Sequence, residues 1–445
     1  MFTIPNYIAL GACVAGLAFA TTARADDDGY ARIGSTSAEL DAAGGALGGP
    51  ATGAMALGGL LLSPSVFVGG SFSKTNYTNP TSSASLGAFR FAPSVYGQLD
   101  EGIHVVKAYV LADGRVSAGH DSRGGGNDSP FTGRAGLAYA WSPTDDFVAR
   151  LSAGYTRQYA LFGSSLASYS SANSATSYVD APVATNILGY RQFTNLTTGR
   201  FSLERKLGDL SFVRAGLDVQ DLVYERPPAG AAASVNGMSY GAFVRAGFWL
   251  TPQVNVFVQG GGDWRRYARS VFDSNGDRVI GGFATDARGL VRGEIYGGLQ
   301  QQFSVSSSFG AVSAPTFGAR VYYDPTPLLT LAAMIDSSYA SVGAQLSAPS
   351  ASTANTLQTR VQAEYNFLEY LKAAIRGGFA QSTYSNKEPT ATAWTGGIGV
   401  SYTFWRNTAI NIDYQFSRHE SGNGASTGVV AYSENIASMG VTYNY

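Results

Sequence analysis

The chain has 445 residues and a formal net charge of -1, and charged residues make up only 14% of it. Typical domains carry about a quarter, so charge is scarce here, and the near-neutral balance gives no indication of a nucleic-acid partner. Beyond the N-terminal segment, no run of about 18 apolar residues predicts a transmembrane helix.

The first residues predict export. An apolar stretch from Ile8 to Ala20 precedes Ala23-Arg24-Ala25, which is the form of a secretory signal peptide. Leu10-Gly11-Ala12-Cys13 also resembles a lipoprotein cleavage site, but the apolar residues that continue beyond it favour ordinary secretion. We therefore expect residues 1–25 to be removed, together with the only cysteine of the chain.

Residues 26–60 differ in composition from everything after them. A capping box formed by Thr36 and Glu39 precedes a short helical run that Gly44-Gly45 would end. One interpretation is a flexible periplasmic tail, which we favour, and the other is a small element that enters or seals the mouth of the barrel predicted below.

From Leu61 onward, apolar and polar residues alternate almost without interruption. In "TAINIDYQFSR" the side chains on one face are apolar and those on the other are polar, since successive side chains of a strand point to opposite sides: Ile410, Ile412, Tyr414 and Phe416 against Asn411, Asp413, Gln415 and Ser417. The polar faces are too hydrophilic for a dry core. The pattern is typical of an outer-membrane barrel, in which one face contacts lipid and the other an aqueous lumen.

The links between these strands alternate in length. Short links with turn-forming residues, such as Ser142-Pro143-Thr144-Asp145, alternate with longer links rich in Gly, Ser and Asn. The fold class is therefore all-β, a transmembrane outer-membrane antiparallel β-barrel over residues 61–445, with about 18 strands and short turns in the periplasm. Sixteen strands remain the alternative if the hairpin around Val279–Ala284 is absent. The longest link, Leu161–Ile187, either constricts the lumen or lies over its mouth.

Aromatic residues near the predicted strand ends indicate two interfacial girdles. They are Tyr139, Trp141, Phe248, Trp249, Phe404 and Trp405 on one rim, and Tyr77, Tyr159, Tyr267, Tyr339 and Tyr384 on the other.

The inward faces carry more basic than acidic side chains. The predicted set is Arg90, Lys107, Arg134, Arg150, Arg200, Arg214, Arg245, Arg265, Arg292, Arg320, Arg360, Lys372 and Arg376, with Asp113, Glu204, Asp218, Asp263, Glu294, Asp336, Glu364 and Asp413. Barrels of this size leave an aqueous channel, and such a surplus tunes its selectivity. The alternative is a network of cross-strand ion pairs that stiffens the barrel.

No motif predicts catalysis, a metal or a cofactor. The three histidines form no Ser/His/Asp arrangement, and we expect neither enzymatic activity nor a cofactor. "DSNGDR", Asp273–Arg278, imitates the start of a calcium loop, but Arg278 stands where Gly belongs and Ala284 where Glu belongs. We interpret it as an Asn-Gly turn in a loop.

Several blocks together resemble a known family. "LSPSVFVGGSFSKTNY" (62–77), "LVRGEIYGGLQQQF" (290–303), "ARVYYDPTPLLTLAA" (319–333), "YLKAAIRGGFA" (370–380) and the closing "NIASMGVTYNY" are similar to the outer-membrane β-barrel porin family of the beta-barrel porin 2 type. The resemblance implies a barrel often associated with exopolysaccharide production. The closing aromatics, Tyr443 and Tyr445, are similar to the C-terminal signal that barrel-assembly machinery recognises.

Three functions follow as hypotheses. The leading one, from the resemblance, is a conduit or accessory barrel for exopolysaccharide export, with polysaccharide-export components as partners. The second is a passive diffusion porin for small, anionic solutes, and the third is a structural or adhesive barrel. All three predict outer-membrane lipid and the barrel-assembly machinery as partners, and the bacterial outer membrane as the location.

Overall fold

A computed structural model gives the structure of the protein. It describes residues 55–57, 59–78, 81–121, 131–161, 191–225, 236–268, 270, 273–285, 290–305, 311–341, 353–384, 391–421 and 431–444. The predicted signal peptide, most of the predicted tail, the Leu161–Ile187 link beyond its first residue and Tyr445 lie outside these ranges. Among the described residues, no helix is long and apolar enough to cross a membrane.

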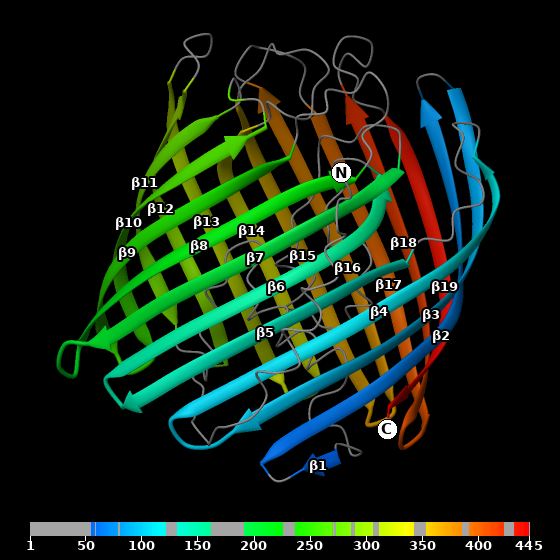
Figure 1. Ribbon diagram of the computed structural model, residues 1–445, viewed down its shortest axis with the longest axis horizontal. Coiled ribbons are helices and arrows are strands. Elements are labelled where there is room, and N and C mark those ends of the chain that lie inside the picture. Colours follow the sequence, from blue (N-terminus) through cyan, green and yellow to red (C-terminus); the bar gives the residue numbers. More distant parts are fainter. Residues whose placement is uncertain are drawn as a thin grey trace, which may run out of the picture.

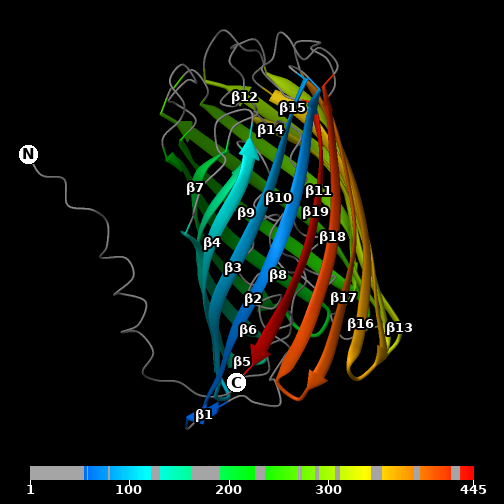
Figure 2. The same cartoon turned by 90° about the vertical axis from the view of Figure 1, so that its right-hand side faces the viewer.

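The described chain is a single antiparallel sheet that closes on itself (Figures 1 and 2). Its strands are β1 (Met55–Leu57), β2 (Leu60–Thr78), β3 (Thr81–Asp100), β4 (His104–Asp121), β5 (Phe131–Thr144), β6 (Phe147–Leu161), β7 (Arg191–Lys206), β8 (Ser211–Glu225), β9 (Gly237–Thr251), β10 (Val254–Tyr267), β11 (Ser274–Thr285), β12 (Val291–Ser304), β13 (Val312–Thr326), β14 (Leu329–Ser341), β15 (Thr353–Leu368), β16 (Leu371–Tyr384), β17 (Ala391–Trp405), β18 (Thr408–Ser421) and β19 (Tyr432–Asn444).

The ring is closed by the first and last long strands. β19 pairs with β2 from Tyr432 opposite Tyr77 to Asn444 opposite Ser65, and every other strand from β2 to β19 pairs with its neighbours in sequence. Strands of such a meander alternate in direction, so the two ends can pair antiparallel only when the number of strands is even. The predicted barrel of 18 strands is confirmed, since Val279–Ala284 lie in β11, which pairs with both β10 and β12.

The short strand β1 lies outside the ring of 18. Met55–Leu57 pair with Leu60–Leu62 at the start of β2, beyond Asn444, where β19 ends. The end of the predicted tail thus covers the part of the β2 edge that β19 does not reach. The division into signal peptide, tail and barrel otherwise stays a prediction.

The links after β3, β5, β7, β9, β13, β15 and β17, each of two to four residues, lie at the end of the barrel where β1 and the end of β19 also lie (Figures 1 and 2). At the other end, only two residues separate the end of β2 from the start of β3. The link before β11 is shorter than expected, because Ser274–Arg278 already belong to that strand. The predicted Asn-Gly turn is therefore wrong. Gly276 instead lies opposite Asp263, whose carboxylate would collide with a Cβ at this position, so glycine makes room for a side chain of β10.

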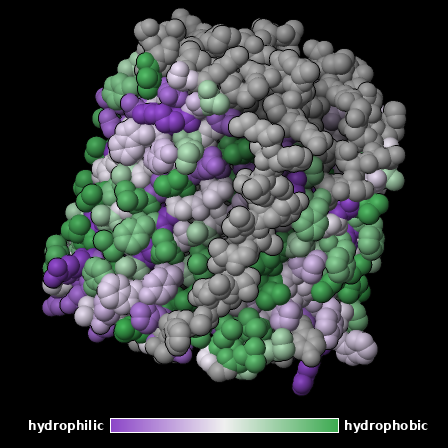
Figure 3. All heavy atoms as spheres, viewed as in Figure 1, coloured by the Kyte–Doolittle hydropathy of each residue, from purple (hydrophilic) through white to green (hydrophobic). Residues whose placement is uncertain are grey.

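The register divides the side chains of the barrel into two faces without a break around the ring. On one face large apolar side chains are exposed, among them Ile375, Leu299 and Val258, which are 62%, 62% and 60% exposed. Apolar residues spread over the visible strands of the outer surface in Figure 3. Charged side chains on this face lie only within about four residues of a strand end. Among the described side chains they are Lys74, Arg157, Arg205, Asp221, Glu225, Arg266, Asp277, Arg418 and Glu420.

The other face is the interior, and its buried residues are mostly polar. Many are Ser, Thr, Gln or charged residues, such as Gln302 at 1% exposure and Arg360 at 4%. Apolar clusters are small, for example Phe257, Ile280 and Ala284. The outer face therefore supplies the hydrophobic surface, and the interior is hydrophilic, as predicted from the alternation.

The predicted girdles need a correction. Tyr77, Trp249 and Tyr267 lie on the interior face, because the register places them opposite Tyr432, Asn255 and Gly237. Tyr77 is buried at 3% exposure and its ring contacts Tyr432. Aromatic residues near strand ends thus serve the interior as well as the rim. Trp141, Phe248 and Phe404 do face outward and are exposed.

Adjacent residues in the middle of β19 test the assignment of the two faces. Met439→Lys should lower the free energy of unfolding in phospholipid vesicles by about 2–4 kcal/mol, because Met439 faces outward and is 56% exposed. Ser438→Lys, one residue earlier, points inward and lies opposite Asp413, so it should change stability little. Urea unfolding followed by tryptophan fluorescence measures both. Equal losses for the two variants would contradict the assignment.

Candidate functional site in the barrel interior

All the predicted inward-facing charged residues lie on one face in the structure. The register places the predicted set, from Arg90 on β3 to Asp413 on β18, on the interior face. The same face has further charged members that the sequence pattern did not indicate, which are Arg115, Lys206, Arg278, Asp100, Asp324 and Glu434. That these residues line a conducting pore stays a prediction.

Two of the interior carboxylates are each shared by two arginines. Asp113 on β4 lies 2.9 Å from Nε of Arg90 on β3 and 3.1 Å from an Nη of Arg115 on its own strand. Asp113 is buried at 4% exposure, so its charge requires compensation. One carboxylate compensated by two guanidinium groups leaves a local positive charge.

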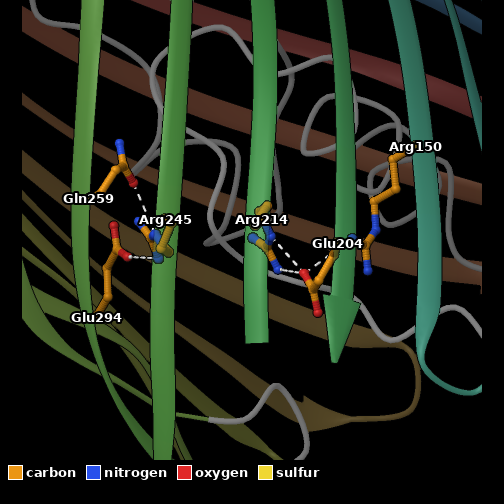
Figure 4. Close-up of polar contacts among 6 residues, drawn as sticks. All are labelled: Arg150, Glu204, Arg214, Arg245, Gln259 and Glu294. Atoms are coloured by element: carbon orange, nitrogen blue, oxygen red, sulfur yellow. Dashed lines mark hydrogen bonds and ion pairs between the residues drawn. The ribbon is translucent and has the colours of Figure 1, made fainter. Parts of the chain in front are cut away.

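The second shared carboxylate is Glu204 on β7, shown in Figure 4. Arg214 on β8 donates to it from Nε and from one Nη, and Arg150 on β6 lies 3.6 Å away. Next to Arg214, Arg245 on β9 donates to Gln259 on β10 at 2.9 Å and to Glu294 on β12 at 3.1 Å. Two neighbouring polar clusters, Arg150–Glu204–Arg214 and Arg245–Gln259–Glu294, therefore lie on the inner wall between β6 and β12.

Two pairs of arginines face each other directly across neighbouring strands. Arg90 lies opposite Arg115, and Arg214 lies opposite Arg245. Like charges in directly opposite positions destabilise a sheet. The carboxylates of Asp113, Glu204 and Glu294 offset this repulsion in part, and the arrangement is one that stability alone would not favour.

Arginines of the interior also stack on aromatic rings. The guanidinium carbon of Arg200 lies 5.7 Å from the ring centroid of Phe243, and that of Arg245 lies 3.9 Å from Phe257. Phe243 in turn lies over Gly216, where a Cβ would be 2.5 Å from the ring. Glycine thus lets the ring lie flat against the wall, and the ring orients the arginine above it through a cation–π contact.

The wall that contains β12–β18 holds its charges differently. Arg376 forms an ion pair with Asp413, and Arg292 lies 2.6 Å from Asp324. Tyr296 donates a hydrogen bond to Asp336. Lys372 is exposed to the interior, whereas Arg360 on the neighbouring strand is buried at 4% exposure. Each of these two ion pairs joins one cation to one carboxylate.

Two of the three histidines have described side chains, and each contacts a tyrosine. His419 is buried and stacks on Tyr432 at a centroid distance of 4.5 Å, and His104 Nδ1 lies 2.7 Å from the Tyr139 hydroxyl. Within the described ranges, no group of three or more His, Cys, Asp or Glu side chains could hold a metal ion. Tyr443 of the predicted assembly signal faces outward and is 46% exposed.

The Glu204 cluster permits a test by double-mutant cycle. Glu204→Gln should lower the free energy of unfolding by about 2 kcal/mol, less than the 3–5 kcal/mol typical of a fully buried pair, because the Glu204 side chain is 17% exposed. Adding Arg214→Gln should recover part of this loss, since it removes one of the uncompensated arginines. Urea unfolding measures the cycle.

The matched control is Glu420→Gln, because Glu420 pairs with Arg418 where both side chains are exposed. That change should cost less than about 0.5 kcal/mol. Strict additivity of the Glu204 and Arg214 substitutions would show that the two side chains do not interact.

Comparison with known proteins places this interior in context. Residues 149–445, more than half of the chain, match the model of the family described as "Putative beta-barrel porin 2". No match is found among curated proteins.

Solved outer-membrane structures are similar at low identity. Acinetobacter baumannii OccAB4 is 10% identical, with a TM-score of 0.44 over 86% of this chain and 98% of that one. The Pseudomonas aeruginosa outer membrane protein OpdK is 11% identical, with a TM-score of 0.42 over 86% and 99%. The Neisseria meningitidis iron transporter FrpB (F3-3 variant) is 8% identical, with a TM-score of 0.42 over 85% and 81%.

The family match agrees with the closed ring of strands, the apolar outer face and the hydrophilic interior. The chain belongs to the beta-barrel porin 2 family and is a porin-like outer-membrane β-barrel channel.

Proposed function

We propose that the channel lets small polar solutes diffuse across the outer membrane, with a preference for anions. The observation that carries the proposal is the charge of the interior. Among the described interior side chains, sixteen are basic and eleven are acidic, which leaves a surplus of five positive charges. Barrels of 16 to 18 strands hold an aqueous channel, and the sign of the charge along its wall favours ions of the opposite sign.

The proposed selectivity is testable with two lysines that extend into the interior. In a planar bilayer with a salt gradient, the wild-type reversal potential should show anion preference. Lys107→Glu/Lys372→Glu lowers the interior surplus by four charges and should abolish most of that preference, most clearly at low salt, where screening is weakest. The control Lys74→Glu/Arg205→Glu makes the same change in charge on the outer face.

The control should leave the reversal potential close to the wild-type value. A wild-type channel without anion preference, together with a reversal potential that the interior variant does not move, would overturn the proposal. The interior charges would then be ion-pair scaffolding.

A second candidate, conduit for exopolysaccharide export, rests on the family resemblance. The interior surplus of basic side chains also supports it, since a polysaccharide that carries carboxylates would meet complementary charge along the channel. Interaction with polysaccharide-export components is part of this candidate.

Export is tested by deletion of the gene in its own host. Extracellular acidic polysaccharide, measured as uronic acid, should fall several-fold and should return with the wild-type gene. The Lys107→Glu/Lys372→Glu gene should restore less than the Lys74→Glu/Arg205→Glu gene. An unchanged amount of polysaccharide after deletion would exclude an essential role in export and leave the diffusion channel.

A further inference from the structure

The positive surplus of the interior is confined to one side of the barrel. Among the described side chains, β3–β9 present nine basic and four acidic groups to the interior, a surplus of five. β12–β18 lie opposite, because each is nine strands further around the ring of 18, and they present five of each sign. The other four strands present two of each sign.

The contacts on the two sides differ in the same sense. On β3–β9 the carboxylates of Asp113 and Glu204 are each shared by two arginines. On β12–β18 the ion pairs Arg292–Asp324 and Arg376–Asp413 are one to one. The first arrangement retains positive charge, whereas the second neutralises it.

The facing arginines of β3–β9 suggest a reason for this difference. Arg90 and Arg115 face each other and share the single carboxylate of Asp113. Arg214 and Arg245 also face each other; Arg245 pairs with Glu294, whereas Arg214 shares Glu204 with Arg150. An anion close to the arginines that share a carboxylate would relieve the repulsion that remains. Guanidinium groups suit phosphate and carboxylate, which they bind with two parallel hydrogen bonds. The arrangement is therefore complementary to an anion and unfavourable without one.

We propose that the β3–β9 wall is a binding track for anions with two or more negative charges, and that the β12–β18 wall is structural. Neighbouring strands lie about 4.8 Å apart, and the Debye length is about 8 Å at physiological salt, so the fields of adjacent basic side chains overlap. A multivalent anion therefore interacts with several of them at once, whereas chloride interacts with few. The inference rests on the proposed anion-selective channel and names the wall and the class of solute.

Two triple variants that each remove three positive charges distinguish anion binding along one wall from an effect of the total interior charge. Lys107→Gln/Arg134→Gln/Arg200→Gln removes three positive charges from β3–β9, and Arg292→Gln/Arg320→Gln/Lys372→Gln removes three from β12–β18. Each full-length protein is inserted in a planar bilayer, and sodium tripolyphosphate is added as the probe. The concentration that halves the current is measured, together with the reversal potential in KCl.

Tripolyphosphate should block the wild-type channel. The β3–β9 variant should raise the half-blocking concentration about tenfold, because it removes three attractions between a positive side chain and the anion at about 8 Å through water. The β12–β18 variant should raise that concentration less than about threefold. The reversal potential should shift equally in both, since it reports total charge. Folding of each variant is checked by electrophoresis, in which the unheated, folded barrel migrates differently from the heated protein. If a triple variant does not fold, Lys107→Gln and Lys372→Gln replace the pair, with about a twofold increase expected for Lys107→Gln alone.

The outcomes are distinguishable. Equal loss of block in the two variants, or an anion-selective wild-type channel that tripolyphosphate does not block, would overturn the one-wall track and leave the proposed channel intact. A wild-type protein with no anion preference would overturn the proposed function and this inference with it.

Discussion

The structure depends on one constraint, which is that every backbone N–H and C=O group within a membrane needs a hydrogen-bond partner in the protein. β19 and β2 satisfy it by pairing over thirteen residues from Ser65 to Tyr77, and this closes the sheet. Closure also fixes which side chains face inward, because a slip of one residue at any pairing would turn a whole strand's apolar side chains inward. The apolar exterior and the hydrophilic interior are therefore two results of the same register.

A hydrophilic interior brings charges close together, and the chain uses them unevenly. The carboxylates of Asp113 and Glu204 each hold two arginines. Glycines such as Gly216 let aromatic rings lie flat against the wall beneath other arginines. The rigid sheet keeps these groups in place even where two arginines face each other. On the proposed anion track the positive charge is already in place in the folded state, so entry of an anion would need little reorganisation.

Much of this could be predicted from the sequence, because alternation with a period of two needs only local information. The strands, their number and the inward face of residues such as Arg360 follow from it. The predictions that were wrong concern features that depend on which residues of neighbouring strands lie opposite each other. The rim is predicted for Tyr77, which instead pairs with Tyr432 inside. A turn is predicted for Asn275-Gly276, which instead pair with β10 and β12 as part of β11, where glycine leaves space for the Asp263 carboxylate. The sharing of Asp113 by Arg90 and Arg115 likewise needs the register between β3 and β4, which no single strand contains.

The central claim is that the polar face of the closed sheet is in contact with water and the apolar face with lipid. The most direct test is a set of single cysteines on β19, since the only native cysteine, Cys13, lies in the segment expected to be removed. Ser438→Cys and Thr442→Cys should react with a water-soluble maleimide in protein inserted in lipid vesicles, whereas Met439→Cys and Val441→Cys should be protected from it and, once labelled with a fluorophore, quenched by spin-labelled lipid. Equal reactivity at all four positions, or protection of the inward pair, would contradict the account.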